Sequence, residues 1–569
     1  MPSIEKLLDQ LEDAKRRFDP SGRAQTEKLL ARAGEKVFSD IELLIRFHES
    51  LLFLRAHPHS EKVFRLTEKL LSTFSARVER IRASGADMTP FDYIEYSGIV
   101  ETTLSGTFSY DIARWLVRRH SSQTEINWER YEKKTGLAAA LARVLPLFYE
   151  DLMVEANIPQ GEWLRAAMGK NDNALKWLID RIDRLPLAEK AKSQLYDSLE
   201  LPVRWKMGRD RASRTNNRRK PRKVFYHTGK MIQRKEVSLR AEIDSPPVEF
   251  EKLSASEGEE IIDMTRETTA VRYRELYGIT HGDGRSVMRT DLGRGVEMFL
   301  WGLRPERRLP LRAYHAGFTL KNGVPINYIE GITLFERTEV GFNTFYTYRE
   351  GESAWVYVRA LKLLNQIAGV TAVSIDPYQL GHHNDEAIES GAFWFYRKLG
   401  FRSTDSRLRN LTEREEKKIA TVSGYRTPAR VLRKLAVAPA IYEHQRASGE
   451  WDGFQVRNIG LAVQRRMASE FGGDASMMRV SVMAEVARAL CISQSDLNDA
   501  EKLAFENLSF ALALIPDLEE WSEEEKRAAA SIIRAKAGED ESVYARLLQK
   551  HARLRKAIIT LGSSDQRAD

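Results

Sequence analysis

An asparagine-glycine pair between two strand-like runs constrains the middle of this chain more than any other feature. Residues 311–320 and 326–335 are both rich in aromatic and branched side chains, and Lys321-Asn322-Gly323 separates them. Asn-Gly between two such runs is a strong short-range signal for a β-hairpin. The sequence therefore predicts an antiparallel pair of strands around residue 322.

The segments after this hairpin alternate between strand and helix patterns. An aromatic and threonine-rich run is typical of a strand, and a short run of apolar residues later on is typical of a buried one. Gly400 stands where a helix stop belongs. The elements expected are a strand at 342–348, a helix at 354–368, a strand at 371–376 and a helix ending at Leu399.

Both ends of the chain read as helical, because apolar residues recur at three- and four-residue steps. The predicted fold class is α+β, with a central, mixed and mostly antiparallel sheet flanked by all-α N- and C-terminal regions. The expected boundaries are a helical domain at 1–203, a basic linker at 204–246, the α+β domain at 247–410 and a helical region at 411–569.

Composition limits the class of protein. A chain of 569 residues exceeds a single core, and 42% hydrophobic with 30% charged residues is typical of a soluble globular protein. The single cysteine, Cys491, excludes an intrachain disulfide framework. No apolar run reaches the roughly 20 residues of a membrane helix, and the first residues lack the pattern of a signal peptide. We therefore expect a cytoplasmic protein without membrane contact.

The net charge of +8 is modest, but its distribution is uneven. Between Arg204 and Lys223 there are ten basic residues and one acid, Asp210. Such a segment could bind nucleic acid through its phosphates, or an acidic partner protein through electrostatic steering. The alternative is a solvated linker, which the interspersed polar residues and the scarcity of aromatic residues favour.

A second motif lies at residues 390–401, which read Ser-Gly-Ala-Phe-Trp-Phe-Tyr-Arg-Lys-Leu-Gly-Phe. Ala392, then Tyr396 four positions later, then the Leu-Gly-Phe ending resembles the closing helix of the GNAT superfamily of N-acetyltransferases. The order of elements over 247–410 is similar to the core of that family. The resemblance implies acyl transfer from acetyl-CoA or another acyl-CoA, with Tyr396 as the general acid that protonates the leaving thiolate. The alternative is that Tyr396 only packs in the core.

The resemblance also implies a loop that binds the pyrophosphate of coenzyme A through backbone N–H groups at a helix N-terminus. The corresponding residues are Arg349, Gly351, Glu352, Ser353 and Ala354. Arg349 and Ala354 fall in register with the family's pattern. The glycine comes one place early, and Glu352 occupies its expected position.

An amine acceptor must lose a proton, and Glu330 in the second strand of the hairpin is the better candidate for the base. Its apolar neighbours in sequence would remove water from the carboxylate and raise its pKa. The alternative is a solvent-facing position or a structural ion pair. His315, in the first strand, is the weaker candidate, and we expect it to be structural.

Three functions follow as hypotheses. The leading one is an acyltransferase that moves an acyl group from acyl-CoA to an amine on a small molecule or protein. The second is a degenerate GNAT fold that serves as a binding or scaffold protein, which Glu350 and Glu352 favour because carboxylates repel a diphosphate. The third is a nucleic-acid-associated protein that uses residues 204–223. No metal is expected, because the sequence has no His-Glu-x-x-His motif.

Overall fold

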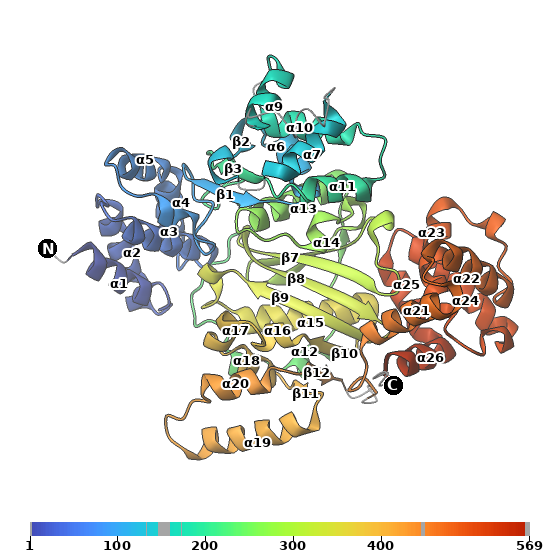
Figure 1. The fold of residues 1–569 in the computed structure, drawn as a ribbon. Helices are drawn as coiled ribbons and strands as arrows, with labels where there is room; N and C mark the ends of the chain where they lie inside the picture. The colour runs from blue at the N-terminus through green and yellow to red at the C-terminus, as the bar shows by residue number, and fades with distance from the viewer. Residues whose placement is uncertain (1–2, 132–133, 146–159, 172, 445–449, 564–569) are drawn as a thin grey trace.

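The structure, a computed structural model, describes residues 3–131, 134–145, 160–171, 173–444 and 450–563. Its centre is a nine-stranded sheet with the strand order β11-β12-β10-β9-β8-β7-β6-β5-β4 (Figure 1). Seven of its eight strand pairings are antiparallel, and only β9 and β10 run parallel. The strands are β4 (Glu251–Lys252), β5 (Met288–Gly293), β6 (Val296–Gly302), β7 (Ala313–Lys321), β8 (Val324–Leu334), β9 (Arg337–Thr344), β10 (Ala372–Ile375), β11 (Arg402–Ser403) and β12 (Ala440–Glu443). The α+β class and the mixed, mostly antiparallel sheet are thus confirmed.

The predicted hairpin is present as β7 and β8, which pair antiparallel from Ala313 with Thr333 to Lys321 with Val324, with a register shift after Thr319. Asn322 and Gly323 form its turn with φ values of 49° and 79°, the left-handed region that this residue pair tolerates. The next strand, β9, begins at Arg337, five residues earlier than the sequence pattern indicated. Residues Tyr346–Tyr348, expected in that strand, form a short 3-10 helix, η7.

Strand β9, helix α15 (Ser353–Ala368) and strand β10 form a parallel strand-helix-strand unit. Gly369 ends α15 in the left-handed conformation, with φ of 68°. Pairing between β9 and β10 stops at Glu339 and Ser374, while β9 continues to Thr344. The last residues of β9 therefore have an edge that β10 does not cover.

The helix predicted to end at Leu399 is broken into two short ones. They are α17 (Asp385–Glu389) and α18 (Ala392–Arg397). Gly391, at φ of 70°, separates them, because a left-handed residue cannot continue a right-handed helix. Helix α16 (Pro377–Leu380) precedes them and connects them to β10.

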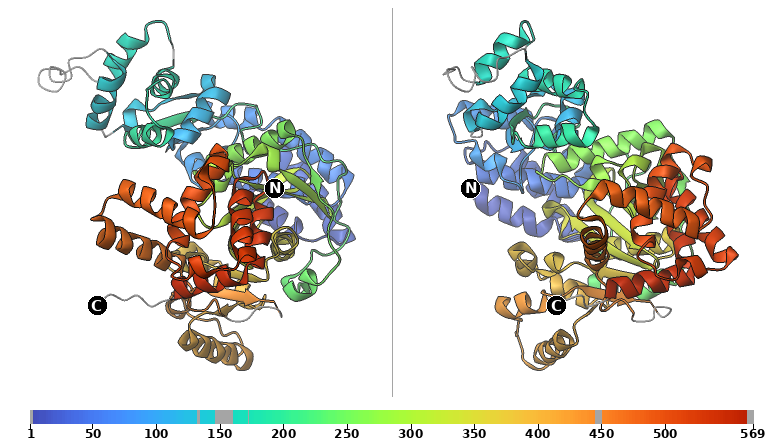
Figure 2. Two further views of the ribbon diagram at one scale, coloured as in Figure 1. Left: turned by 90° about the vertical axis from the view of Figure 1, so that its right-hand side faces the viewer. Right: turned by 45° about the vertical axis from the view of Figure 1, so that its right-hand side comes forward.

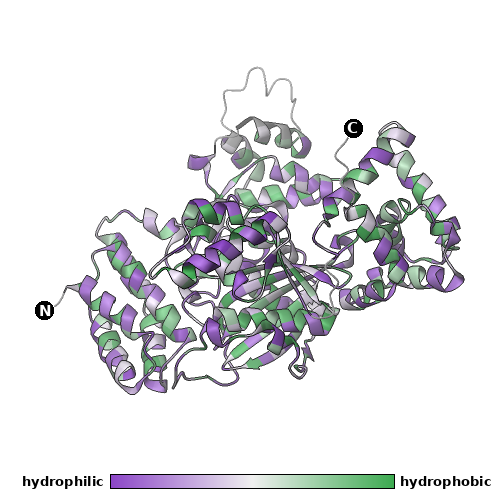
Figure 3. Cartoon of the chain, turned by 90° about the horizontal axis from the view of Figure 1, so that it is seen from below, coloured by the Kyte–Doolittle hydropathy of each residue, from purple (hydrophilic) through white to green (hydrophobic). Residues whose placement is uncertain are grey.

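The two faces of the sheet carry different helices. Gly278 of α14 (Tyr277–Thr280) lies against Tyr314 and Ala316 of β7, so these side chains mark one face. His315, the residue between them, hydrogen-bonds Ser542 of α25 (Glu541–Lys550) on the other face. Because side chains alternate along a strand, Glu330, paired with Ala316, shares the face of α14. Figure 3 shows hydrophobic residues on the central elements and mixed hydropathy along the outer helices.

The N-terminal region differs from the all-α expectation. Residues up to Ala83 are helical and pack beside the central sheet, as Figure 1 shows. They form α1 (Ile4–Ala14), α2 (Pro20–Gly34), α3 (Ile41–Ala56), α4 (Glu61–Ser72) and α5 (Ser75–Ala83). The next part contains a three-stranded antiparallel sheet in the order β1-β3-β2, with its own apolar core. The all-α prediction was wrong there because its strands are only three to five residues long, too short for a clear alternation.

This second part stands above the central sheet in Figure 1 and to one side of it in Figure 2. Its elements are β1 (Thr103–Thr107), α6 (Tyr110–Arg119), β2 (Thr124–Ile126), α7 (Lys134–Val144), α9 (Gln160–Met168), α10 (Ala174–Asp183), α11 (Glu189–Asp197) and β3 (Pro202–Lys206). Helix α13 (Ala255–Ala270) reaches its core through Ala270 and contacts the large sheet domain as well.

The large sheet also extends past residue 410, where a helical region was expected to begin. Strand β12 pairs with both β10 and β11, so the chain returns to the sheet after α19 (Ser406–Thr421) and α20 (Ala429–Leu435). The C-terminal region is therefore not all-α from 411 onward. From residue 456 the described chain is helical, with α21 (Val456–Phe471), α22 (Ala475–Ala489), α23 (Asp499–Leu512), α24 (Glu523–Ala537), α25 and α26 (Ala552–Ser563).

The basic segment, residues 204–223, is packed into the molecule over residues 212–217, whereas Lys220, Arg222 and Lys223 are exposed. Arg214 is 3% exposed and its neighbours Ser213 and Thr215 are fully buried, so this part is no solvated linker. Six arginines of the segment form ion pairs with carboxylates from other parts of the chain. Arg204 pairs with Glu125 and Glu129, Arg209 with Glu79 and Glu101, Arg211 with Glu267, Arg214 with Glu49, Arg218 with Glu68, and Arg222 with Glu251.

Candidate functional site at the open edge of β9

Glu330 lies on β8 with its carboxylate held by two donors. The Tyr314 hydroxyl donates to Glu330 Oε1, and the backbone N–H of Gly278 donates to the same carboxylate. Burial raises the pKa of Glu330 above its ordinary value in spite of these donors. No ion pair neutralises Glu330 among the described residues, so the structure gives it the desolvated environment that the sequence suggested.

Tyr396 lies on α18 and reaches the open edge of β9 through Gln379 of α16. The Gln379 side chain donates from Nε2 to Val340 O at 2.8 Å and accepts at Oε1 from the Phe342 N–H at 3.3 Å. The Tyr396 hydroxyl donates to the same Oε1 at 3.4 Å. Gln379 therefore pairs with the strand where β10 does not, and burial raises the pKa of Tyr396, which keeps its phenol protonated.

Gly341 lies between Glu330 and the side chain of Gln379. It is the cross-strand partner of Glu330 on β9, between the two residues that Gln379 pairs with. A methyl group at Gly341 would lie 3.9 Å from both Glu330 Oε2 and Gln379 Nε2, in ordinary van der Waals contact. The missing side chain leaves a small space with a carboxylate of raised pKa on one side and an amide that contacts Tyr396 on the other.

The predicted phosphate loop is the segment between η7 and α15, and its charged side chains are engaged. Arg349 forms an ion pair with Glu386 of α17, so it bridges the start of α15 and α17. Glu350 pairs with Arg16 at 2.7 Å near the surface. The backbone N–H of Gly351 donates to Tyr348 O at 2.9 Å.

Glu352 is buried at the N-cap position of α15, where its carboxylate interacts with Arg294 and Lys321. It also accepts from the backbone N–H of Ile232 at 3.0 Å. Burial opposes its charge, but Arg294 and Lys321 keep the pKa of Glu352 below its ordinary value. The negative charge of Glu352 is therefore balanced by two cations inside the protein, and its carboxylate is not exposed to solvent beside the loop.

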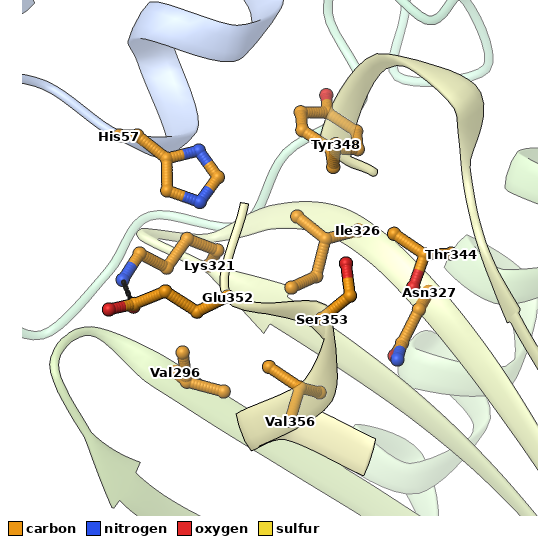
Figure 4. Close-up of a pocket in the computed structure, with 10 residues that line it drawn as sticks. All are labelled: His57, Val296, Lys321, Ile326, Asn327, Thr344, Tyr348, Glu352, Ser353 and Val356. Atoms are coloured by element: carbon orange, nitrogen blue, oxygen red, sulfur yellow. Dashed lines mark hydrogen bonds and ion pairs between the residues drawn. The ribbon is translucent and has the colours of Figure 1, made fainter. Parts of the chain in front are cut away.

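A small cavity lies behind Ser353 at the start of α15 (Figure 4). Its volume is about 10 Å³, room for one water molecule. Both amide atoms of Asn327, Thr344 Oγ1 and His57 Nδ1 are buried without a hydrogen-bond partner around it. Burial lowers the pKa of His57 well below its ordinary value, so this imidazole is neutral. The cavity fits a water molecule that serves these polar atoms, and it is too small for a cofactor.

The described contacts thus connect Glu330 to Tyr396 only indirectly, through the space at Gly341 and the side chain of Gln379. The charged side chains of residues 349–354 are paired within the chain. Sequence reasoning missed Gln379, Tyr314 and Gly278, because their roles depend on contacts between distant segments. Within the sequence, the only indication for these three residues was their position near the end of a strand or in a short helix. His315 is buried and donates or accepts at 3.1 Å to Ser542, in agreement with the structural role expected for it.

Comparisons with protein-family models, curated proteins and solved structures find no match to this chain. In the described ranges, no three or more His, Cys, Asp and Glu side chains are grouped so as to hold a metal ion. None of the described helices has both the length and the hydrophobicity needed to span a bilayer.

Proposed function

We propose that this protein is an acyltransferase that moves an acyl group from acyl-CoA to an amine. The observation that carries the proposal is that the Glu330 carboxylate and the Gln379 amide, which accepts from Tyr396, both lie beside Gly341 of β9. The arrangement β9–α15–β10, with the 349–354 loop at the start of α15, supports it further. It gives the loop the strand-to-helix position that a diphosphate-binding turn requires.

In the proposed reaction, the amine nitrogen attacks the thioester carbonyl, a C–N bond forms and the C–S bond breaks. Glu330 accepts the proton that the amine loses, and Tyr396 donates its hydroxyl proton to the leaving thiolate. The products are an amide and free coenzyme A, and the proton on Glu330 returns to Tyr396 through solvent. The raised pKa of Glu330 suits a base. The raised pKa of Tyr396 keeps its hydroxyl protonated and available to donate, although it also makes the phenol a weaker acid.

Binding of coenzyme A would require Arg349 to exchange Glu386 for the pyrophosphate. This exchange is chemically reasonable, because a guanidinium binds phosphate as well as carboxylate. The Glu352 carboxylate stays with Arg294 and Lys321, so it adds little repulsion.

The first test is calorimetric titration with acetyl-CoA. We expect saturable binding, weakened at least tenfold in Arg349→Ala, whose side chain is half-exposed and whose loss leaves the core intact. The matched control is Arg407→Ala, since Arg407 forms a comparable surface pair with Asp405. An absence of heat up to millimolar ligand would exclude the coenzyme A mechanism.

The second test follows amide formation on a panel of amines. Glu330→Gln should keep acetyl-CoA binding and lower kcat by about 10²–10³-fold. Tyr396→Phe should also lower kcat and leave the thioester affinity unchanged. The residual activity of Glu330→Gln should lose the fall toward low pH that protonation of Glu330 causes. Wild-type kcat in either variant would rule out the assigned role.

The second candidate is a binding or scaffold protein that has this fold and does not use coenzyme A. The ion pairs of the loop favour this candidate, because Arg349, Glu350 and Glu352 all have partners within the chain. The acetyl-CoA titration separates the two candidates.

A further inference from the structure

A large cleft lies between the second N-terminal part and the central domain, away from the 349–354 loop. Its walls come from α6 and α11 on one side and from α13, α14 and the short helix η6 (Pro305–Arg307) on the other. Its volume is about 850 Å³, in the range of ligand-binding pockets. In Figure 1 it corresponds to the region between α6 and α11 above and α13 and α14 below.

The cleft is lined by more basic than acidic side chains. The basic ones are Arg114, Arg118, Arg119, Lys190, Arg266, Arg304, Arg307 and Arg308, and the acidic ones are Asp111, Glu189, Glu259, Asp263 and Glu306. Walls of one prevailing charge focus the electrostatic field inside a cleft. The lining therefore favours an anionic ligand.

Several ion pairs cross the cleft and fix its walls. Arg119 of α6 pairs with Asp263 of α13, and the Trp115 indole N–H donates to the same carboxylate at 2.9 Å. Arg307 of η6 lies 3.8 Å from Asp111 of α6. Each of these pairs cancels one positive and one negative charge, so the excess of basic over acidic side chains in the lining is unchanged.

Other cations of the lining remain available to a ligand. Lys190 is exposed and forms no hydrogen bond or ion pair with any residue that the structure describes. Arg118 has a side chain 65% exposed and, among the described residues, a single ion pair, to Asp183 at 3.3 Å. Arg304 lies 3.6 Å from Glu259, a loose pair. Cations on both walls suit a ligand with more than one negative charge.

The cleft leads toward the proposed base. Tyr277 lines it with 41% of its surface exposed, and its ring lies 5.9 Å from the ring of Tyr314. Tyr314 donates to Glu330, and the residue after Tyr277, Gly278, donates its N–H to the same carboxylate. A ligand in the cleft would therefore contact Tyr277, which packs against Tyr314 and precedes Gly278.

We infer that this cleft binds a phosphate-bearing molecule of nucleotide size, and that this molecule is the amine acceptor. The second half rests on the proposed function. The first half does not, because it depends only on the charges and dimensions of the cleft. Phosphate is favoured over a single carboxylate because a diphosphate can engage Arg118 and Lys190 on one wall together with Arg304 on the other.

The test is calorimetric titration with inorganic pyrophosphate and with ADP at low and moderate salt. We expect both to bind, and the double variant Arg118→Glu/Lys190→Glu to bind at least tenfold more weakly. The matched control, Lys220→Glu/Lys223→Glu, carries the same charge change on exposed lysines of the basic segment outside the cleft and should bind like the wild type.

Three results would overturn the inference. The first is wild-type affinity for both probes in the cleft variant. The second is loss of pyrophosphate binding in Arg349→Ala with no change in the cleft variant, which would place the phosphate at the loop. The third is binding of single-stranded RNA without binding of either probe, which would make the cleft a nucleic-acid site.

The same titrations separate this inference from the proposed function. Pyrophosphate binding that depends on Arg118 and Lys190, in a protein that does not bind acetyl-CoA, would support the cleft and reject the acyltransferase. Binding of acetyl-CoA, without binding of pyrophosphate or ADP that depends on Arg118 and Lys190, would support the acyltransferase and reject the cleft as a phosphate site.

Discussion

Single charged residues decide how the start of α15 is held. Glu352 is the only carboxylate that contacts both Arg294 and Lys321 in the described chain; Glu352 and Lys321 are buried, and Arg294 is partly exposed. Replacing one partner of a buried ion pair leaves an uncompensated charge, which costs about 3–5 kcal/mol. A nearby carboxylate, Glu350, has an exposed ion pair with Arg16 and offers a direct comparison.

We predict that Glu352→Gln lowers the free energy of unfolding by about 3 kcal/mol, measured by urea denaturation at pH 7. Glu350→Gln should change it by less than about 1 kcal/mol, because exposed pairs contribute little. Equal effects of the two substitutions would show that Glu352 is not the anion that neutralises Lys321.

One histidine near Lys321, His227, allows a prediction of how the stability of the protein depends on pH. The His227 ring is buried among Phe18, Phe225 and His57, and neither ring nitrogen has a hydrogen-bond partner. Burial, together with the charge of Lys321, lowers the pKa of His227 to about 3. The unfolded chain binds a proton near pH 6.5 and the folded chain does not, so stability decreases as pH falls below 6.5.

For His227 this loss amounts to about 2 kcal/mol between pH 7.5 and pH 5. We predict that His227→Phe, which keeps an aromatic ring in the site, reduces the decrease in stability over this interval by that amount. Urea denaturation at the two pH values measures it. An unchanged pH dependence in the variant would mean that His227 is protonated in the folded state.

Among the elements, the C-terminal end of α15 joins the central domain to the C-terminal helices. Gly369 has φ of 68°, and a methyl group there would lie 2.5 Å from Gln549 Oε1 of α25. Gln549 donates to Phe335 O at 2.8 Å and to Ala368 O. A substitution at Gly369 would therefore strain the backbone and displace this side chain.

We predict that Gly369→Ala destabilises the protein by about 2–4 kcal/mol, the sum of about 1–2 for the left-handed conformation and about 1–2 for the displaced hydrogen bonds. Gly391→Ala is the control, because Gly391 has a similar φ of 70° but no neighbour within 4 Å of an added methyl group. Chemical denaturation of both variants should show the backbone cost alone at Gly391.

Elements with a local signal were predictable from the sequence, and those that depend on distant contacts were not. The hairpin at Asn322-Gly323 and the helix α15 are defined by their own residues. Their predicted boundaries therefore differ from the observed ones by no more than two residues. The short strands β1 to β3 and β12 exist because distant strands pair with them, and no periodicity within three to five residues can show this.

The candidate site follows the same division. Glu330 and Tyr396 were selected from their neighbours in sequence, and the structure places Glu330 on β8 and Tyr396 on α18, beside Gln379. Gln379, which connects Tyr396 to the edge of β9, could not be predicted, because nothing near it in sequence indicates that its amide pairs with this strand. The cleft that Lys190 lines could not be predicted from the sequence either, because its two walls come from segments far apart along the chain.

At the scale of the whole molecule, the basic segment holds the separate parts together. Arg214 is buried and donates to Glu49 of α3 at 2.8 Å, to Glu95 O at 2.9 Å and to Thr347 of η7 at 3.2 Å. Although burial would raise the pKa of Glu49, Arg214 and His48 lower it to about 2, so the pair is ionised at neutral pH. One side chain thus links the first helices to the central domain.

We predict that Arg214→Leu lowers the free energy of unfolding by about 3–5 kcal/mol, because it leaves Glu49 buried without its partner. Lys220→Leu, on an exposed residue of the same segment, should change it by less than about 0.5 kcal/mol. Scanning calorimetry would show whether the first helices then melt separately. A single transition at the wild-type temperature would contradict the linking role.

The contact between Glu49 and Thr347 also has a consequence for synthesis. These residues are 298 positions apart, so the partners of α3 leave the ribosome long after α3 itself. At 5–20 residues per second the delay is on the order of 15 to 60 s. During that time the nascent helices carry Glu49 without Arg214 for part of the delay and without Thr347 for all of it. During this interval the N-terminal helices are accessible to chaperones and proteases without these two contacts.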